Sequence, residues 1–119
     1  MTPHTCAMIA ASAYTYISGQ KVAGMHDHAS GRDLQIAAEA RGTQLQGYDG
    51  DRGVQFGGAI PELYDAGDKT YVSMEISGDK ARGHDRKSGT SYSALVSNGR
   101  VQVYDYASDT WFTFDVQVA

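Results

Sequence analysis

The chain has 119 residues, enough for one domain with its own hydrophobic core, and we expect a single domain over residues 1–119. Its formal net charge is −4 and no run of Lys and Arg occurs, which argues against nucleic acid as a partner. No apolar stretch reaches the roughly 18 residues of a membrane span. The single cysteine, Cys6, excludes an internal disulfide and favours a reducing, cytoplasmic location.

The N-terminal segment is apolar from Cys6 to Ile17, interrupted by Ser and Thr. No Lys or Arg precedes Lys21, so the segment lacks the basic start of a secretory signal. Two structures remain open. Ile9–Ile17 is the first strand if the chain alternates strands throughout, but the alanines of Cys6–Ala13 also favour a helix.

The rest of the first half predicts four strands separated by turn residues. The segment Arg32–Ala40 contains good helix formers, but a strand is favoured because it aligns with a clear strand in the second half. The four predicted strands are Lys21–Asp27, Arg32–Ala40, Thr43–Tyr48 and Gly53–Ala59.

The second half shows the alternation of a half-buried strand more clearly, with Val72, Met74 and Ile76 on one side. Asn98-Gly99 predicts a hairpin with a type I′ turn. In the last strand, Phe112, Phe114, Val116 and Val118 are expected to face inward. The five predicted strands are Thr70–Ser77, Lys80–Asp85, Thr90–Ser97, Arg100–Tyr106 and Thr110–Val118.

An internal repeat relates the two halves. Ile17-Ser18-Gly19 matches Ile76-Ser77-Gly78, and with a one-residue gap at Met25 the match extends to Ser30-Gly31 and Ser88-Gly89. The copies cover about 1–60 and 61–119. The predicted fold is therefore mostly β: two tandem five-strand meanders forming a small pseudo-twofold β-barrel, with a β-sandwich as the alternative and an N-terminal segment that is either strand or helix.

The pairs His26-Asp27 and His84-Asp85 occupy equivalent places in the two copies. The favoured interpretation is structural: each Asp accepts backbone N–H groups in the following Ser-Gly turn. The alternative is a ligand site or a hydrolase centre, although adjacent strand residues point to opposite faces. His26 and His28 share a face and could chelate an ion, but this signal is weak, so we predict no metal site and no cofactor.

The aromatic residues form the second candidate site. Six of them fall on the side opposite the apolar positions: Tyr14, Tyr16, Tyr48, Tyr104, Tyr106 and Trp111. Exposed rings with a polar group favour ligand stacking or a protein interface. The predicted ligand-binding residues are Tyr48, Tyr104, Tyr106, Trp111, His26 and His84.

The sequence therefore predicts a non-enzymatic binding module that takes a small molecule, a glycan or a protein partner through the aromatic face or the barrel mouth. Self-association into a homodimer through that face is a further expectation. One alternative is a metal-dependent or His/Asp-based hydrolase. The other is a structural or inhibitory interaction protein.

Overall fold

The computed structural model describes residues 1–119, which form one helix, α1 (Pro3–Ser18), and twelve strands. The strands are β1 Val22–Asp27, β2 Arg32–Leu34, β3 Ile36–Arg41, β4 Gln44–Asp49, β5 Val54–Ala59, β6 Glu62–Asp65, β7 Thr70–Ser73, β8 Glu75–Ser77, β9 Lys80–Asp85, β10 Thr90–Ser97, β11 Arg100–Asp105 and β12 Thr110–Val118.

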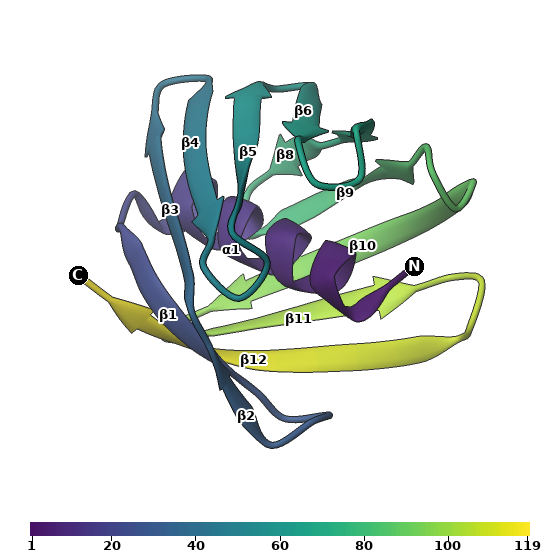
Figure 1. Ribbon diagram of the computed structural model, residues 1–119. Coiled ribbons are helices and arrows are strands. Elements are labelled where there is room, and N and C mark those ends of the chain that lie inside the picture. The colour runs from purple at the N-terminus through teal and green to yellow at the C-terminus, as the bar shows by residue number, and fades with distance from the viewer.

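Ten of the strands close into an antiparallel barrel (Figure 1). Around the barrel the order is β10, β11, β12, β1, β3, β4, β5, β6, β7 and β9, and β9 pairs again with β10. The short strands β2 and β8 extend this ring beside β1 and β9. The prediction of a mostly-β barrel is confirmed, and the sandwich alternative is wrong because the sheet closes on itself.

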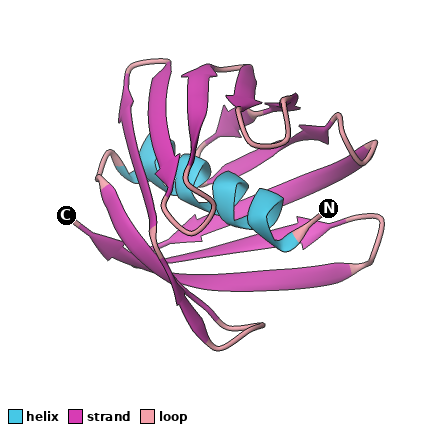
Figure 2. Cartoon of the chain, viewed as in Figure 1, coloured by secondary structure: helices cyan, strands magenta, loops and turns pink.

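Helix α1 runs through the inside of the barrel, where strands surround it (Figure 2). Every residue from Thr5 to Thr15 is buried, as expected for a helix that is apolar on all sides. The hydroxyl of Thr2 accepts the Thr5 N–H at its start, and Gly19 ends it in the left-handed conformation. The prediction of a strand over Ile9–Ile17 is therefore wrong, and the helical alternative is confirmed.

Buried polar side chains of α1 form hydrogen bonds inside the barrel. Ser12 donates to the Met8 carbonyl, Thr15 accepts from the Ala40 N–H, and the Tyr14 hydroxyl accepts from the Gly99 N–H. No buried side-chain nitrogen or oxygen lacks a hydrogen bond. Tyr14 is 2% exposed, so its predicted place on the outer face is wrong, and Tyr16 lies on the same helix.

Three strand predictions need correction. The predicted strand Arg32–Ala40 is broken at Gln35 into β2 and β3, and Thr70–Ser77 is broken at Met74 into β7 and β8. In both cases the two pieces continue along one neighbour, β1 or β9, so the break bends a single barrel strand. Strand β6 was not predicted, because four residues with two acidic ends give little periodicity.

The hairpin at Asn98-Gly99 is present, with Ser97 paired to Arg100. Only Gly99 has a positive φ there, so the predicted type I′ turn, which needs two, is wrong. In β12, Phe114 is 2% exposed as predicted, whereas Val118 is 41% exposed because it lies beyond the core at the end of the strand.

One turn recurs at the end of five alternate strands, β1, β4, β6, β9 and β11. Each strand finishes with a Tyr or His followed by a buried Asp, and the sixth residue of the motif has a positive φ. The buried carboxylates are Asp27, Asp49, Asp65, Asp85 and Asp105. The residues with positive φ are Gly31, Gly53, Lys69, Gly89 and Asp109.

The buried Asp organises each of these turns through its own side chain. Asp27 accepts from the Ala29 N–H and the Ser30 hydroxyl, and Asp85 accepts from the Lys87 N–H and the Ser88 hydroxyl. The structural interpretation of Asp27 and Asp85 is confirmed. The unit that recurs in the structure is a hairpin with this turn, which is shorter than the predicted repeat. The division into two copies of about 60 residues stays a prediction.

Replacing Asp85 with Ala removes the carboxylate that accepts hydrogen bonds from the Lys87 N–H and the Ser88 hydroxyl. We expect the free energy of unfolding to fall by roughly 1–3 kcal/mol, the cost of leaving such groups unpaired. Urea denaturation measures this loss. Asp79→Ala is the control, because Asp79 is exposed in a turn and makes no side-chain hydrogen bond. Equal losses in both variants would contradict the role of the buried Asp.

Burial raises the pKa of the Cys6 thiol to about 12, with Asp105 adding to the shift. At pH 8 we therefore expect iodoacetamide to modify Cys6 at least about 100-fold more slowly in the native protein than in 6 M guanidinium, because the reactive species is the thiolate. Mass spectrometry gives the rates. The control places a thiol at an exposed position by Ser97→Cys in a Cys6→Ala chain. Equally fast reaction of Cys6 and of this exposed thiol would contradict the enclosed helix.

Candidate functional site

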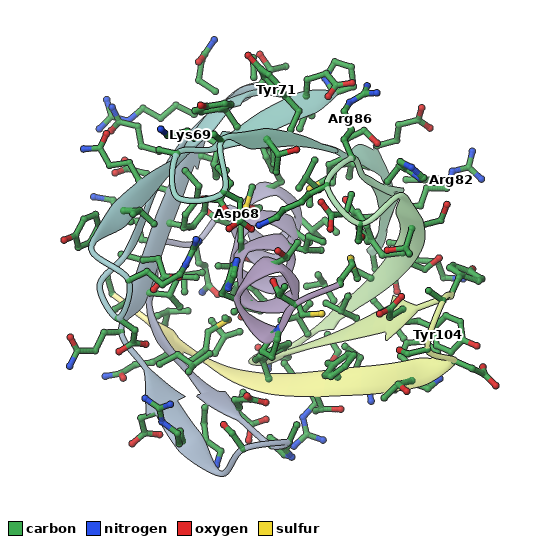
Figure 3. The ribbon with its side chains drawn as sticks, turned by 45° about the vertical axis from the view of Figure 1, so that its right-hand side comes forward. Asp68, Lys69, Tyr71, Arg82, Arg86 and Tyr104 are labelled. Carbon is green, nitrogen blue, oxygen red and sulfur yellow. The ribbon has the colours of Figure 1, made fainter.

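Two exposed rings and one half-buried ring gather on the outside of β11 and β12. We call this group the aromatic cluster: Tyr104, which is half-buried, with Tyr106 and Trp111. The ring of Tyr104 lies 4.8 Å from that of Tyr106 and 5.0 Å from that of Trp111, measured between centroids. Tyr106 is 58% exposed and Trp111 is 54% exposed. Tyr104 projects near the β11–β12 turn, on a different side of the barrel from Tyr71 (Figure 3).

Neighbouring polar groups hold two of these rings in place. The Tyr104 hydroxyl donates to the Asp109 carboxylate, and the hydroxyls of Tyr106 and Ser93 lie 2.9 Å apart. Asp109 occupies the left-handed position that glycine fills in three of the five turns, with φ 53°. Asp tolerates this left-handed conformation. A glycine at the same position would have no side chain to accept the Tyr104 hydrogen bond.

A hollow of about 420 Å³ adjoins the aromatic cluster over β9 and β10. Tyr106 forms one wall, His84, Ser91 and Ser93 contribute polar groups, and Nδ1 of His84 lies 3.2 Å from the Ser91 hydroxyl. The two serines are not among the residues that the sequence predicts for the site. Their outward direction follows from the inward alternation of Tyr92 and its neighbours along β10.

Two further predicted residues, Tyr48 and His26, lie on another part of the barrel. They line a second hollow of about 640 Å³ between β12 and β4. The six predicted ligand residues are therefore divided: Tyr104, Tyr106, Trp111 and His84 are brought together, and Tyr48 and His26 are not with them. His26 on β1 and His84 on β9 are separated by β12, β11 and β10, so they share no centre.

The histidines do not form catalytic pairs with the aspartates beside them. Asp27 and Asp85 point inward, while His26 bonds Asp33 at 2.8 Å and His28 bonds Asp115 at 2.7 Å. The rings of His26 and His28 lie 5.7 Å apart, but each has its own carboxylate partner. Neither His26 with Asp27 nor His84 with Asp85 therefore forms a side-chain pair, and the hydrolase alternative stays a prediction.

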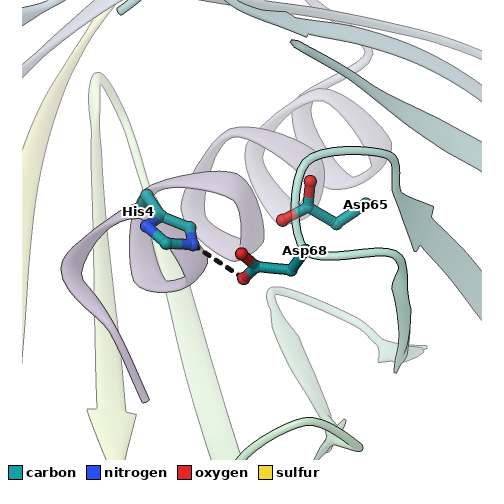
Figure 4. A group of neighbouring side chains, drawn as sticks. All are labelled: His4, Asp65 and Asp68. Atoms are coloured by element: carbon teal, nitrogen blue, oxygen red, sulfur yellow. Dashed lines mark hydrogen bonds and ion pairs between the residues drawn. The ribbon is translucent and has the colours of Figure 1, made fainter. Parts of the chain in front are cut away.

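A third group of polar side chains lies at the start of α1 and is shown in Figure 4. His4, Asp65 and Asp68 bring ligand-type atoms within 4.8 Å of one another, with a hydrogen bond of 2.7 Å between His4 and Asp68. Arg52 bonds both oxygens of Asp65, and Lys87 lies 3.3 Å from Asp68. Each of the two carboxylates is thus paired with a cationic side chain. The group is an ion-pair network that connects the start of α1 to the neighbouring turns.

No family model matches this chain, and no curated protein or solved structure shows a significant similarity to it. The single helix does not have the length and apolarity that a membrane-crossing helix requires. The chemistry of the surface therefore carries the functional assignment.

Burial opposes ionisation of Asp68, but hydrogen bonds from His4 and Lys87 hold its pKa below the usual value. Because the pKa of Asp68 is lower in the folded than in the unfolded protein, its ionised carboxylate stabilises the fold at pH values above the unfolded-state pKa. This stabilisation is lost as the pH falls through the folded-state pKa. We expect Asp68→Asn to lose roughly 1–2 kcal/mol at pH 7. The difference from the unmodified chain should narrow below about pH 4.

Denaturant titrations at both pH values measure this difference. Asp33→Asn is the matched control, because Asp33 also pairs with a histidine but its side chain is 91% exposed, so that pair contributes little. A loss in Asp68→Asn that does not change with pH would contradict the electrostatic explanation.

Proposed function

We propose that this protein is a non-enzymatic binding module that holds a neutral glycan on the aromatic cluster and its adjoining hollow. The observation that carries the proposal is the half-buried ring of Tyr104 in contact with the exposed rings of Tyr106 and Trp111, with the two tyrosines oriented by hydrogen bonds. Oriented exposed rings offer a ready surface on which the C–H face of a sugar ring can stack.

The groups around the rings fit the hydroxyls of a sugar. Ser91, Ser93 and His84 supply donors and acceptors in the hollow next to Tyr106. The hollow, about 420 Å³, lies within the range of small-ligand sites, which is roughly 300–1,000 Å³. A concave polar surface next to rings suits a small polyhydroxylated ligand better than a flat protein interface.

The charge of the surface argues against an anionic ligand. The nearest guanidinium, that of Arg82, lies 3.7 Å from the Glu75 carboxylate, and the whole chain carries a net charge of −4. The barrel interior is filled by α1, so the outer surface rather than the barrel mouth is the proposed site. The cytoplasmic location and the homodimer stay predictions.

The protein's single tryptophan, Trp111, lies in the proposed site, so its fluorescence reports binding directly. We expect one of cellohexaose, laminarihexaose and chitohexaose to shift or quench the Trp111 emission. Tyr104→Ala should weaken that binding about two- to tenfold, because removal of one stacked ring costs roughly 0.5–1.5 kcal/mol.

Tyr71→Ala is the matched control, since Tyr71 is 48% exposed on another side of the barrel and its loss should leave binding unchanged. If none of the three sugars binds, the glycan proposal is wrong. If sedimentation instead shows a dimer that Tyr104→Ala and Trp111→Ala convert to monomer, the aromatic cluster is a self-association surface.

A further inference from the structure

A second surface also combines exposed tyrosines with polar side chains. Two hollows of about 640 and 960 Å³ meet on the outer side of the sheet from β12 to β6 and share Ala23, Ala37 and Tyr48. We call this continuous depression the Tyr48 groove. It lies on strands that contribute nothing to the aromatic cluster, apart from β12 at its rim.

The strand register explains why this surface is hollow. Across neighbouring strands, Ala37, Tyr48 and Gln55 stand in one row, and Gln46, Gly57 and Tyr64 stand in the next. Gly57 has no side chain, and its backbone approaches the Leu45 carbonyl so closely that an added Cβ would lie 2.4 Å from that oxygen. The gap above Gly57 is thus built into the strand pairing, with Gln46 and Tyr64 on either side of Gly57 and Tyr48 in the next row.

The groups that border the gap are neutral and able to bond hydroxyls. Gln46 and Gln55 each offer an amide donor and acceptor, and Tyr48 and Tyr64 are 48% and 37% exposed. At the rim, Lys21 and Glu39 pair at 3.6 Å, so their charges cancel. In the smaller hollow, the carboxylates of Asp33 and Asp115 pair with His26 and Arg100. Exposed tyrosines beside uncharged polar groups and paired charges are what this surface shares with the aromatic cluster and its hollow.

The recurring turn gives the two surfaces a common origin in the fold. Tyr48 and Tyr104 occupy the same position, directly before the buried Asp of their turns, on β4 and β11. Equivalent positions on a closed barrel point outward in different directions, so two ligands can bind at once.

We infer that the Tyr48 groove is a second binding site for the same class of neutral glycan, and that the protein is bivalent. This inference rests on the proposed function for the class of ligand, but the residues that form the Tyr48 groove are different from those of the aromatic cluster. Two sites on one rigid barrel would let the protein hold one long glycan chain at two points, or join two chains.

The test uses whichever of cellohexaose, laminarihexaose and chitohexaose binds the full chain. Isothermal titration should give two bound oligosaccharides per protein. Tyr48→Ala should reduce this to one while leaving the Trp111 fluorescence response unchanged, and Trp111→Ala should also leave one. The double variant Gln46→Ala, Gln55→Ala repeats the Tyr48→Ala result without removing a ring. The control Asp79→Ala, in an exposed turn that lines neither hollow, keeps two.

The outcomes separate the two ideas. One bound oligosaccharide that Trp111→Ala abolishes and Tyr48→Ala does not affect overturns the second site and leaves the proposed function standing. One bound oligosaccharide that only Tyr48→Ala abolishes supports the Tyr48 groove and overturns the role of the aromatic cluster. Failure of all three sugars to bind overturns both. Thermal unfolding of each variant confirms that the binding changes are not losses of fold.

Discussion

The enclosed helix is the constraint on which the rest of the structure depends. Residues Thr5 to Thr15 have no face that can meet water, so the sheet has to surround α1 completely. Closure removes the exposed strand edges that an open sheet would present. It also fills the interior with the protein's own side chains, which moves any binding surface to the outside of the barrel.

The five buried aspartates supply hydrogen-bond acceptors for the polar groups of the turns that join the barrel strands. Each carboxylate is buried near the core and accepts N–H or hydroxyl hydrogens of its own turn, so it remains paired. Arg52 links two neighbouring turns by bonding Asp49 and Asp65, and His4 links the helix to Asp68. The polar network therefore fixes the helix in the barrel and the spacing of the hairpins together.

The same turn also decides where rings can stand on the surface. Because the Asp points inward, the residue before it points outward, and at Tyr48, Tyr64 and Tyr104 that residue is aromatic. Structural and binding positions thus alternate along one strand. In the β11–β12 turn, Asp109 has both a structural role and a role in the proposed binding site. It occupies the backbone position with positive φ that favours glycine, and its carboxylate accepts the hydrogen bond that orients the Tyr104 ring.

The sequence by itself determined the local features: the alternation of Tyr92, Ala94 and Val96, the turns at Asp27 and Asp85, and the hairpin at Asn98-Gly99. It left a barrel and a sandwich both open as ways to bury many short strands. Thr2-Pro3 also carried a helix-start signal that could have decided the N-terminal segment. Only the tertiary structure decided that the strands close into a barrel that α1 fills. It also decided that Tyr104 contacts Tyr106 and Trp111, that His84 lines the hollow beside Tyr106, and that Tyr48 and His26 lie elsewhere. Periodicity reports which face a residue takes, but strand order and closure, which depend on contacts between distant residues, decide its neighbours.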